Sequence, residues 1–337
     1  MWYSGHMHSY KLMGIAGAAC VLAGLVGACD KAASKPSGGG AGQASKDGAP
    51  NAADAYESVH AALGPALLGA SGDKASSTAL TERGHVAPGP AAPDLSKLLK
   101  EHAEDIDRLV EATRLGTCDF GVDYTAGLEA LMPHLGKVRA LGRVLKADAG
   151  RLLEAGDLDG AAKRIAAIER LAAHVLRPAH SIIELLVANA VARLGTEFVN
   201  QHPALAKAPW KTDVQQGLAE LEQEISRTGG AISHDMDMTL KALREGSKML
   251  DLRSGGGRNW AAVGQAEREE AVKKLQAIQV EVGKAWNGSG AVARLAAIEQ
   301  QAVNDGVGDL MASRSRTRKA LDDLLVEIKK AKTALGK

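Results

Sequence analysis

The sequence is poor in the side chains that most ligand sites use. Only 3% of its residues are aromatic, and two of them are phenylalanines. Stacking on bases or sugars needs exposed aromatic rings, so this composition argues against nucleic acid as a partner. Lysine and arginine number 41 against 40 aspartates and glutamates, so no net field selects a polyanion or an anionic lipid surface.

Cysteine is equally scarce, with three in the whole chain. Cys20 and Cys29 lie in or next to an apolar N-terminal run, which leaves Cys118 alone in the remainder. The body is therefore expected to hold no intrachain disulfide. Cys118 has no evident base partner in the sequence, so we interpret it as a small buried hydrophobic residue.

Motifs of catalysis and cofactor binding are also missing. The chain has no His-Glu-x-x-His, no paired Cys-x-x-Cys, no Cys-x-x-Cys-His, no Gly-x-Ser-x-Gly and no phosphate-binding loop. We therefore predict a protein that is not an enzyme and uses no cofactor.

Some histidines and carboxylates still qualify as metal-ligand candidates. His180 and Glu184 are four residues apart on one predicted helix face, and His174 is near them in sequence. A carboxylate-bridged di-iron bundle would need paired Glu-x-x-His motifs, which do not occur. Residues 234–237, His-Asp-Met-Asp, offer further ligands, although acidic residues are also favoured at a helix start. Capping or solvated roles explain all of these better than a metal does.

The N-terminus of the sequence contains a candidate export signal. Lys11 precedes an apolar run from Leu12 to Ala28, and the run ends in Val26-Gly27-Ala28-Cys29. This ending resembles a bacterial lipobox, in which the cysteine is lipidated after the signal peptide is removed. We expect residues 1–28 to be that signal and Cys29 to carry the lipid, so that the protein is exported and anchored to the cell envelope, in the inner or the outer membrane. The alternative is an uncleaved membrane anchor.

Residues 29–93 have the composition of a disordered tether. They consist largely of Gly, Ala, Ser, Pro, Lys and Asp, which cannot bury enough apolar surface to offset the entropy of ordering. A short amphipathic patch from Ala55 to Leu68 favours a transient helix that Gly64-Pro65 interrupts.

Residues 94–204 are predicted to form a helical-hairpin core. Asp94 can cap the first helix, and Gly156-Asp157 opens a tight turn between two further helices. Pro133 predicts either a helix start or a kink. A last helix, from Ser181 to Val199, has a Ser181–Glu184 capping box and apolar residues around much of its circumference, so we expect it to be central, with Leu186 buried.

Residues 205–337 predict a second helical segment that ends in a long helical hairpin. Within it, Gly290–Glu299 echoes the sequence of Gly160–Glu169. The fold class expected for the body is all-α, with stacked antiparallel helical hairpins arranged as a bundle or a short α-solenoid after the tether.

One resemblance supports this class. Cys118-x-Phe120, the helix start Pro133-His134-Leu135 and the turn at Gly156-Asp157 resemble a group of secreted bacterial helical proteins, and more distantly tetratricopeptide-type hairpins. The resemblance implies stacked helices and brings no activity.

The expected function is that of a non-catalytic cell-envelope lipoprotein. Its helical body would serve as an interaction or scaffold module for another envelope protein, because stacked hairpins present grooves. Two alternatives stay open: a structural spacer or adhesin-like surface protein, and a metal-binding protein that uses His, Asp and Glu.

Overall fold

The computed structural model describes residues 50–70, 94–250, 258–311 and 313–336. Over these ranges the chain is helical, and its one non-helical pairing is an isolated bridge between Asn51 and Thr117. The all-α prediction is therefore confirmed. The predicted signal peptide, Cys29 and most of the predicted tether lie outside the described residues. No helix in the described ranges is both long and apolar enough to cross a bilayer.

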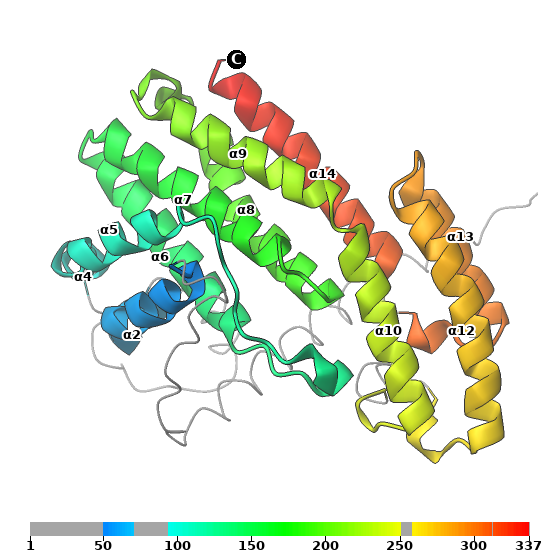
Figure 1. Ribbon diagram of the computed structural model, residues 1–337. Helices are drawn as coiled ribbons and strands as arrows, with labels where there is room; N and C mark the ends of the chain where they lie inside the picture. Colours follow the sequence, from blue (N-terminus) through cyan, green and yellow to red (C-terminus); the bar gives the residue numbers. More distant parts are fainter. Residues whose placement is uncertain (1–49, 71–93, 251–257, 312, 337) are drawn as a thin grey trace, which may run out of the picture. The chain divides into compact units, whose positions relative to one another are not determined.

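The helices follow one another around a single core (Figure 1). The first group is α2 (Ala52–Ala70), α4 (Leu95–Glu101), α5 (Ala103–Ala112), η1 (Tyr124–Glu129), α6 (His134–Glu154), α7 (Leu158–Leu176), α8 (Ile182–Gln201), η2 (Pro203–Lys207) and α9 (Lys211–Ser226). The second group is α10 (Gly229–Glu245), η3 (Trp260–Ala262), α12 (Gln265–Trp286), α13 (Ala291–Asn304), η4 (Gly308–Leu310) and α14 (Arg314–Ala334).

The α6–α7 hairpin forms where the turn chemistry predicts it. Gly156 has a φ of 81°, and the Asp157 carboxylate accepts a hydrogen bond of 2.7 Å from the Gly160 N–H. Asp157 thus caps α7. Of the two alternatives at Pro133, the structure has the helix start: Pro133 is the N-cap residue of α6.

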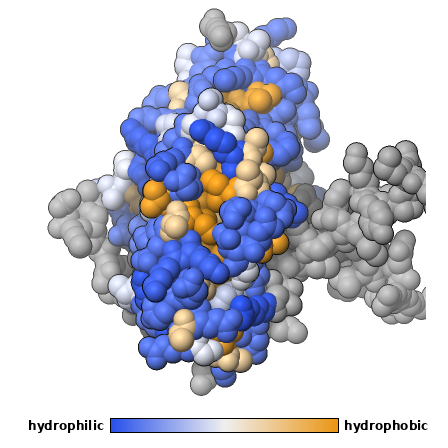
Figure 2. Space-filling model, turned by 90° about the vertical axis from the view of Figure 1, so that its right-hand side faces the viewer, coloured by the Kyte–Doolittle hydropathy of each residue, from blue (hydrophilic) through white to orange (hydrophobic). Residues whose placement is uncertain are grey.

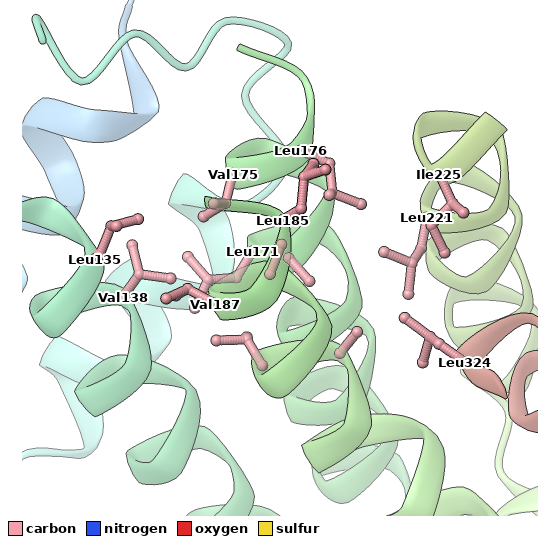
Figure 3. Packing of buried hydrophobic residues seen from close by; sticks show 14 of the residues in the cluster. Leu135, Val138, Leu171, Val175, Leu176, Leu185, Val187, Leu221, Ile225 and Leu324 are labelled. Atoms are coloured by element: carbon pink, nitrogen blue, oxygen red, sulfur yellow. The ribbon is translucent and has the colours of Figure 1, made fainter. Parts of the chain in front are cut away.

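The central helix is α7, and not the helix at 181–199 as predicted. α7 packs on α6, α8 and α9, and side chains from these helices and α14 meet around it (Figure 3). The alanines of α7 allow the backbones of neighbouring helices to approach closely. Buried polar residues interrupt its apolar sequence pattern, so the sequence alone did not mark α7 as the central helix. α8 also contacts several helices, but Leu186 is only half-buried and Leu185 is the fully buried residue.

The tether prediction was wrong for residues 50–70. α2 packs on α5 and α6, and its buried face consists of Ala52, Tyr56, Val59, Leu63 and Leu67. Gly64 (φ 66°, ψ 165°) breaks the helical path before Pro65, and the chain still returns Leu67 to the core. Gly64-Pro65 was expected to interrupt the helix, but the buried apolar face continues past the bend to Leu67.

Side-chain hydrogen bonds fasten the start of α2 to the loop before η1. Asn51 Nδ2 donates to the Asp119 carbonyl at 2.8 Å, and Asn51 Oδ1 accepts from the Asp119 N–H at 2.9 Å. The Ala52 N–H donates to the Thr117 carbonyl at 2.9 Å. This segment is consequently part of the folded body.

The second group continues the core with helices that each pack on the next. α10 packs on α12, α12 on α13 and α13 on α14, while α14 returns to α8 and α9 (Figure 1). The predicted terminal hairpin is thus a run of three packed helices. Within this group, a buried ion pair of 3.1 Å joins Asp235 of α10 to Arg314 of α14.

Candidate functional site

The structure brings two of the three metal-ligand candidates into one cluster. We define the histidine cluster as His134, His180, His234, Tyr124 and Glu184. The ring centroids of Tyr124 and His180 lie 4.2 Å apart, and those of His180 and His234 lie 4.6 Å apart. The cluster joins η1, the start of α8 and α10, which the sequence did not predict to meet.

Glu184 occupies the centre of the cluster as a helix cap. Its carboxylate accepts hydrogen bonds from the Tyr124 hydroxyl (2.5 Å), the Ser181 hydroxyl (3.0 Å) and the His180 N–H (2.8 Å). Ser181 Oγ accepts from the Glu184 N–H at 3.3 Å, so the Ser181 half of the predicted capping box is confirmed, while the carboxylate accepts the His180 N–H in place of the Ser181 N–H. Glu184 is fully buried, which excludes a solvated role for it. Burial and the Glu184 carboxylate raise the pKa of Tyr124.

His134 faces the same carboxylate without a hydrogen bond. Its Nε2 lies 3.9 Å from Glu184 Oε1, and neither ring nitrogen has a hydrogen-bond partner. Its ring stacks on Phe120 at 4.2 Å, so the Cys-x-Phe and Pro-His-Leu motifs meet here. Burial lowers the pKa of His134 to about 4, so the imidazole is neutral at neutral pH.

His174 makes its contacts elsewhere. The Tyr56 hydroxyl of α2 lies 2.6 Å from His174 Nδ1, and burial, assisted by Arg177, lowers the pKa of this histidine to about 4. Within the described ranges, no group of three or more His, Cys, Asp or Glu residues is arranged to hold a metal ion. In the 234–237 run, Asp235 binds Arg314 and the Ile182 N–H, and Asp237 accepts from Gln279.

Cys118 is buried, as predicted. Desolvation raises the pKa of its thiol to about 12, which disfavours the nucleophilic thiolate at neutral pH.

A polar groove opens on the surface of the first group of helices. The arginine groove, as we call it, has a volume of about 660 Å³ and lies between the end of α5, one side of α7 and α9. Its charged lining residues are Arg114, Arg170, Arg177, Arg227, Asp213, Glu220 and Glu224, and His174 also lines it.

The charges of the arginine groove are joined in two networks. Arg170 holds Asp213 through both terminal nitrogens, and Arg114 reaches the same carboxylate at 3.4 Å. At the other end, Arg177 Nε donates to Glu224 at 3.1 Å, and Arg227 approaches that carboxylate at 3.5 Å. The arginines differ in solvent exposure: 6% of the Arg170 side chain is exposed, against 60% of the Arg227 side chain.

Sequence reasoning missed this groove. Arg170 and Arg177 are seven residues apart, which places both on one face of α7. This spacing was the one feature of the sequence that could have indicated the groove. Their partners come from α9, and Arg114 comes from the end of α5, so only the tertiary fold assembles the lining.

A second surface feature lies away from the groove. Hydrophobic side chains gather near the middle of the face that Figure 2 shows, within a hydrophilic surround. Val280 of α12 and Val303 of α13 are more than half exposed.

The comparisons with known proteins add no family. No protein-family model, no curated protein and no solved structure matches this chain. Functional argument therefore rests on the residues and their geometry.

Proposed function

We propose that this protein is an exported, lipid-anchored helical module of the cell envelope that binds another protein and is not an enzyme. The lipobox-like ending at Cys29 supports the anchor. The arginine groove is the single observation that carries the binding role, because its volume is in the range of ligand-binding clefts, roughly 300–1,000 Å³.

The lining of the groove favours a polypeptide segment that carries carboxylates. Its lining combines four arginines with three acidic side chains. Guanidinium groups bind carboxylates through paired hydrogen bonds, and an incoming Asp or Glu can replace an existing partner without leaving the arginine unpaired. Arg114 and Arg227 are the accessible positions for this exchange, since 33% and 60% of their side chains are exposed.

Site-specific photo-crosslinking in cells tests the binding role. We would place the crosslinker at Gln216 and at Gln223, which are exposed and line the groove, and at Gln300 of α13 as a matched exposed control. Both groove positions should capture the same envelope protein, and Arg114→Glu combined with Arg227→Glu should abolish that product. Equal capture at Gln300, or a product indifferent to the charge reversal, would contradict the proposal.

The anchor needs a separate test. Metabolic labelling with a fatty acid should mark the wild-type chain and leave Cys29→Ala unlabelled. Equal labelling of the two chains would remove the lipid anchor from the proposal and leave the groove untouched.

A further inference from the structure

Glu169 is a carboxyl group without a partner in the middle of the core. It lies on α7, is fully buried, and neither of its carboxyl oxygens has a hydrogen-bond partner. An ionised carboxylate in such a place would lose its hydration without compensation, which costs several kcal/mol. The position thus differs from three other buried acids, Asp148, Glu184 and Asp235, which all have partners.

Two glycines on the neighbouring helices give this side chain its space. A Cβ atom at Gly195 of α8 would overlap Glu169 Oε1 and lie 3.0 Å from its Cδ. A Cβ atom at Gly217 of α9 would lie 3.2 Å from Glu169 Cβ. The carboxyl group therefore sits against the backbone of α8, at the point where α7 also meets α9.

Titratable groups nearby are already paired with each other. On α7 the next residue, Arg170, holds Asp213 of α9 and approaches Glu220 at 3.9 Å. On α8, Arg193 and Glu197 flank Gly195 and pair with each other at 3.1 Å. Burial is the one cause that raises the pKa of Glu169 well above its ordinary value, with no contribution from a neighbouring charge.

We infer that Glu169 is a proton-dependent contact: its neutral carboxyl group permits the close packing of α7 on α8 and α9, and loss of the proton drives these helices apart. The direction follows from linkage. When the helices separate or unfold, water reaches the carboxyl group and it ionises near pH 4.5, its ordinary range. The packed state is therefore favoured at low pH, and its stability falls as pH rises above about 4.5 toward the raised pKa of the folded state.

The contact reaches the arginine groove through the same two helices. Arg170 and Arg177 stand on α7, and Asp213 and Glu224 stand on α9, so separation of α7 from α9 would break the pairs that close the groove. Regulation of partner binding by pH is the step that rests on the proposed function. The packing effect of Glu169 does not depend on it.

Variants of the full chain test the packing effect. Glu169→Gln is isosteric and cannot ionise, and Glu169→Met removes the polar group while keeping an unbranched shape. Relative to both, the wild-type equilibrium constant for unfolding should rise as pH increases above 5, by at most about tenfold per pH unit. Glu299→Gln is the matched control, because Glu299 accepts hydrogen bonds from the Ser315 N–H and hydroxyl, and it should keep the wild-type pH profile.

A spectroscopic measurement covers the case in which a variant does not fold. The infrared spectrum of the wild type at pH 5 should contain the carbonyl stretch of a protonated carboxylic acid that is shielded from exchange with D₂O and that is missing from Glu169→Gln. A wild-type spectrum without this band, or parallel pH profiles for wild type and Glu169→Gln, would overturn the inference.

The groove is tested by a separate readout. Crosslinking at Gln216 should change with pH in the wild type and remain constant in Glu169→Gln. If the groove captures no protein at any pH, the proposed function fails while the unfolding and infrared results still decide the role of Glu169. If the groove captures a partner equally at every pH, the regulatory step is overturned.

Discussion

Two segments of similar sequence are buried to different extents in this protein. Gly160–Glu169 begins α7 and Gly290–Glu299 begins α13. In α7, Ile168 and Glu169 are fully buried, whereas the corresponding Ile298 and Glu299 of α13 are partly exposed. Helices surround α7 on three sides, while α13 packs on α12 and α14 (Figure 1).

The comparison shows that the number of helices packed around a segment decides how many of its side chains are buried, even when the sequence is similar. Both segments place a glutamate after Ala-Ala-Ile, at the same point of the apolar stripe. In α13 a neighbouring serine, Ser315, satisfies that glutamate. In α7 the glutamate fits into the space left by Gly195 and Gly217, where no hydrogen-bond partner reaches its carboxyl oxygens, so the same residue becomes an isolated buried acid.

The largest contrast is expected from equivalent isoleucines. Ile168→Ala should reduce the free energy of unfolding by about 4 kcal/mol, because it opens a cavity among α7 and its neighbours. Ile298→Ala should reduce it by about 1 kcal/mol, since solvent already reaches that side chain. Urea unfolding followed by circular dichroism measures both, and equal losses would contradict the difference in packing.

A second pair compares the arginines of the two segments. Arg164 is buried, donates from Nε to Asp148 at 2.9 Å and reaches Asp107 at 2.7 Å. Arg164→Met leaves the fully buried Asp148 with Arg151 alone, so it should cost about 3 kcal/mol. Arg294 is exposed, and Arg294→Met should change the unfolding free energy by less than about 0.5 kcal/mol. Comparable effects in chemical denaturation would refute this assignment.

Acid should destabilise the α7 region through His174. Its pKa is lowered to about 4 in the folded protein, against 6.5 ordinarily, so the unfolded chain takes up a proton first as pH falls. The folded state should therefore lose about 2 kcal/mol between pH 7.5 and pH 5 from this residue. His174→Gln should flatten that part of the pH profile of thermal stability, and an unchanged slope would show that the ring is not held neutral.

The smallest of these effects concerns the histidine cluster. Glu184→Ala keeps the bond from the N–H of residue 184 to Ser181 Oγ, but it removes the carboxylate that accepts from the His180 N–H and leaves the Tyr124 hydroxyl unpaired, at a cost of about 1–2 kcal/mol. His180→Ala keeps the Glu184 carboxylate and should cost about 0.5 kcal/mol, because its ring is only partly buried. Thermal melts of the two variants should differ in that order, and the reverse order would show that the rings, not the carboxylate, stabilise this end of α8.

Local chemistry explains which features the sequence predicted. The Asp157 turn, the Pro133 helix start and the Ser181 half of the capping box each depend on residues a few positions apart, and the structure contains all three. The all-α class follows from the same short-range patterns.

Features that depend on distant residues could not be predicted in this way. The central position of α7 was obscured because Glu169 and Arg170 interrupt its apolar pattern, although both are buried. A transient helix was expected at 55–68, but the packing of α2 on the body was missed because the composition is that of a linker and Gly64-Pro65 suggested a break. The histidine cluster and the arginine groove each combine helices from separate parts of the chain, which no local spacing reveals.

Native-state hydrogen exchange tests the central claim, that α7 is the most enclosed helix, most directly. The amides of residues 165–172 in α7 should exchange through global unfolding alone and should be the slowest in the described ranges. The equivalent amides of α13, residues 295–302, should exchange faster through local opening. Equal protection of the two helices, or slower exchange in α13, would contradict the account.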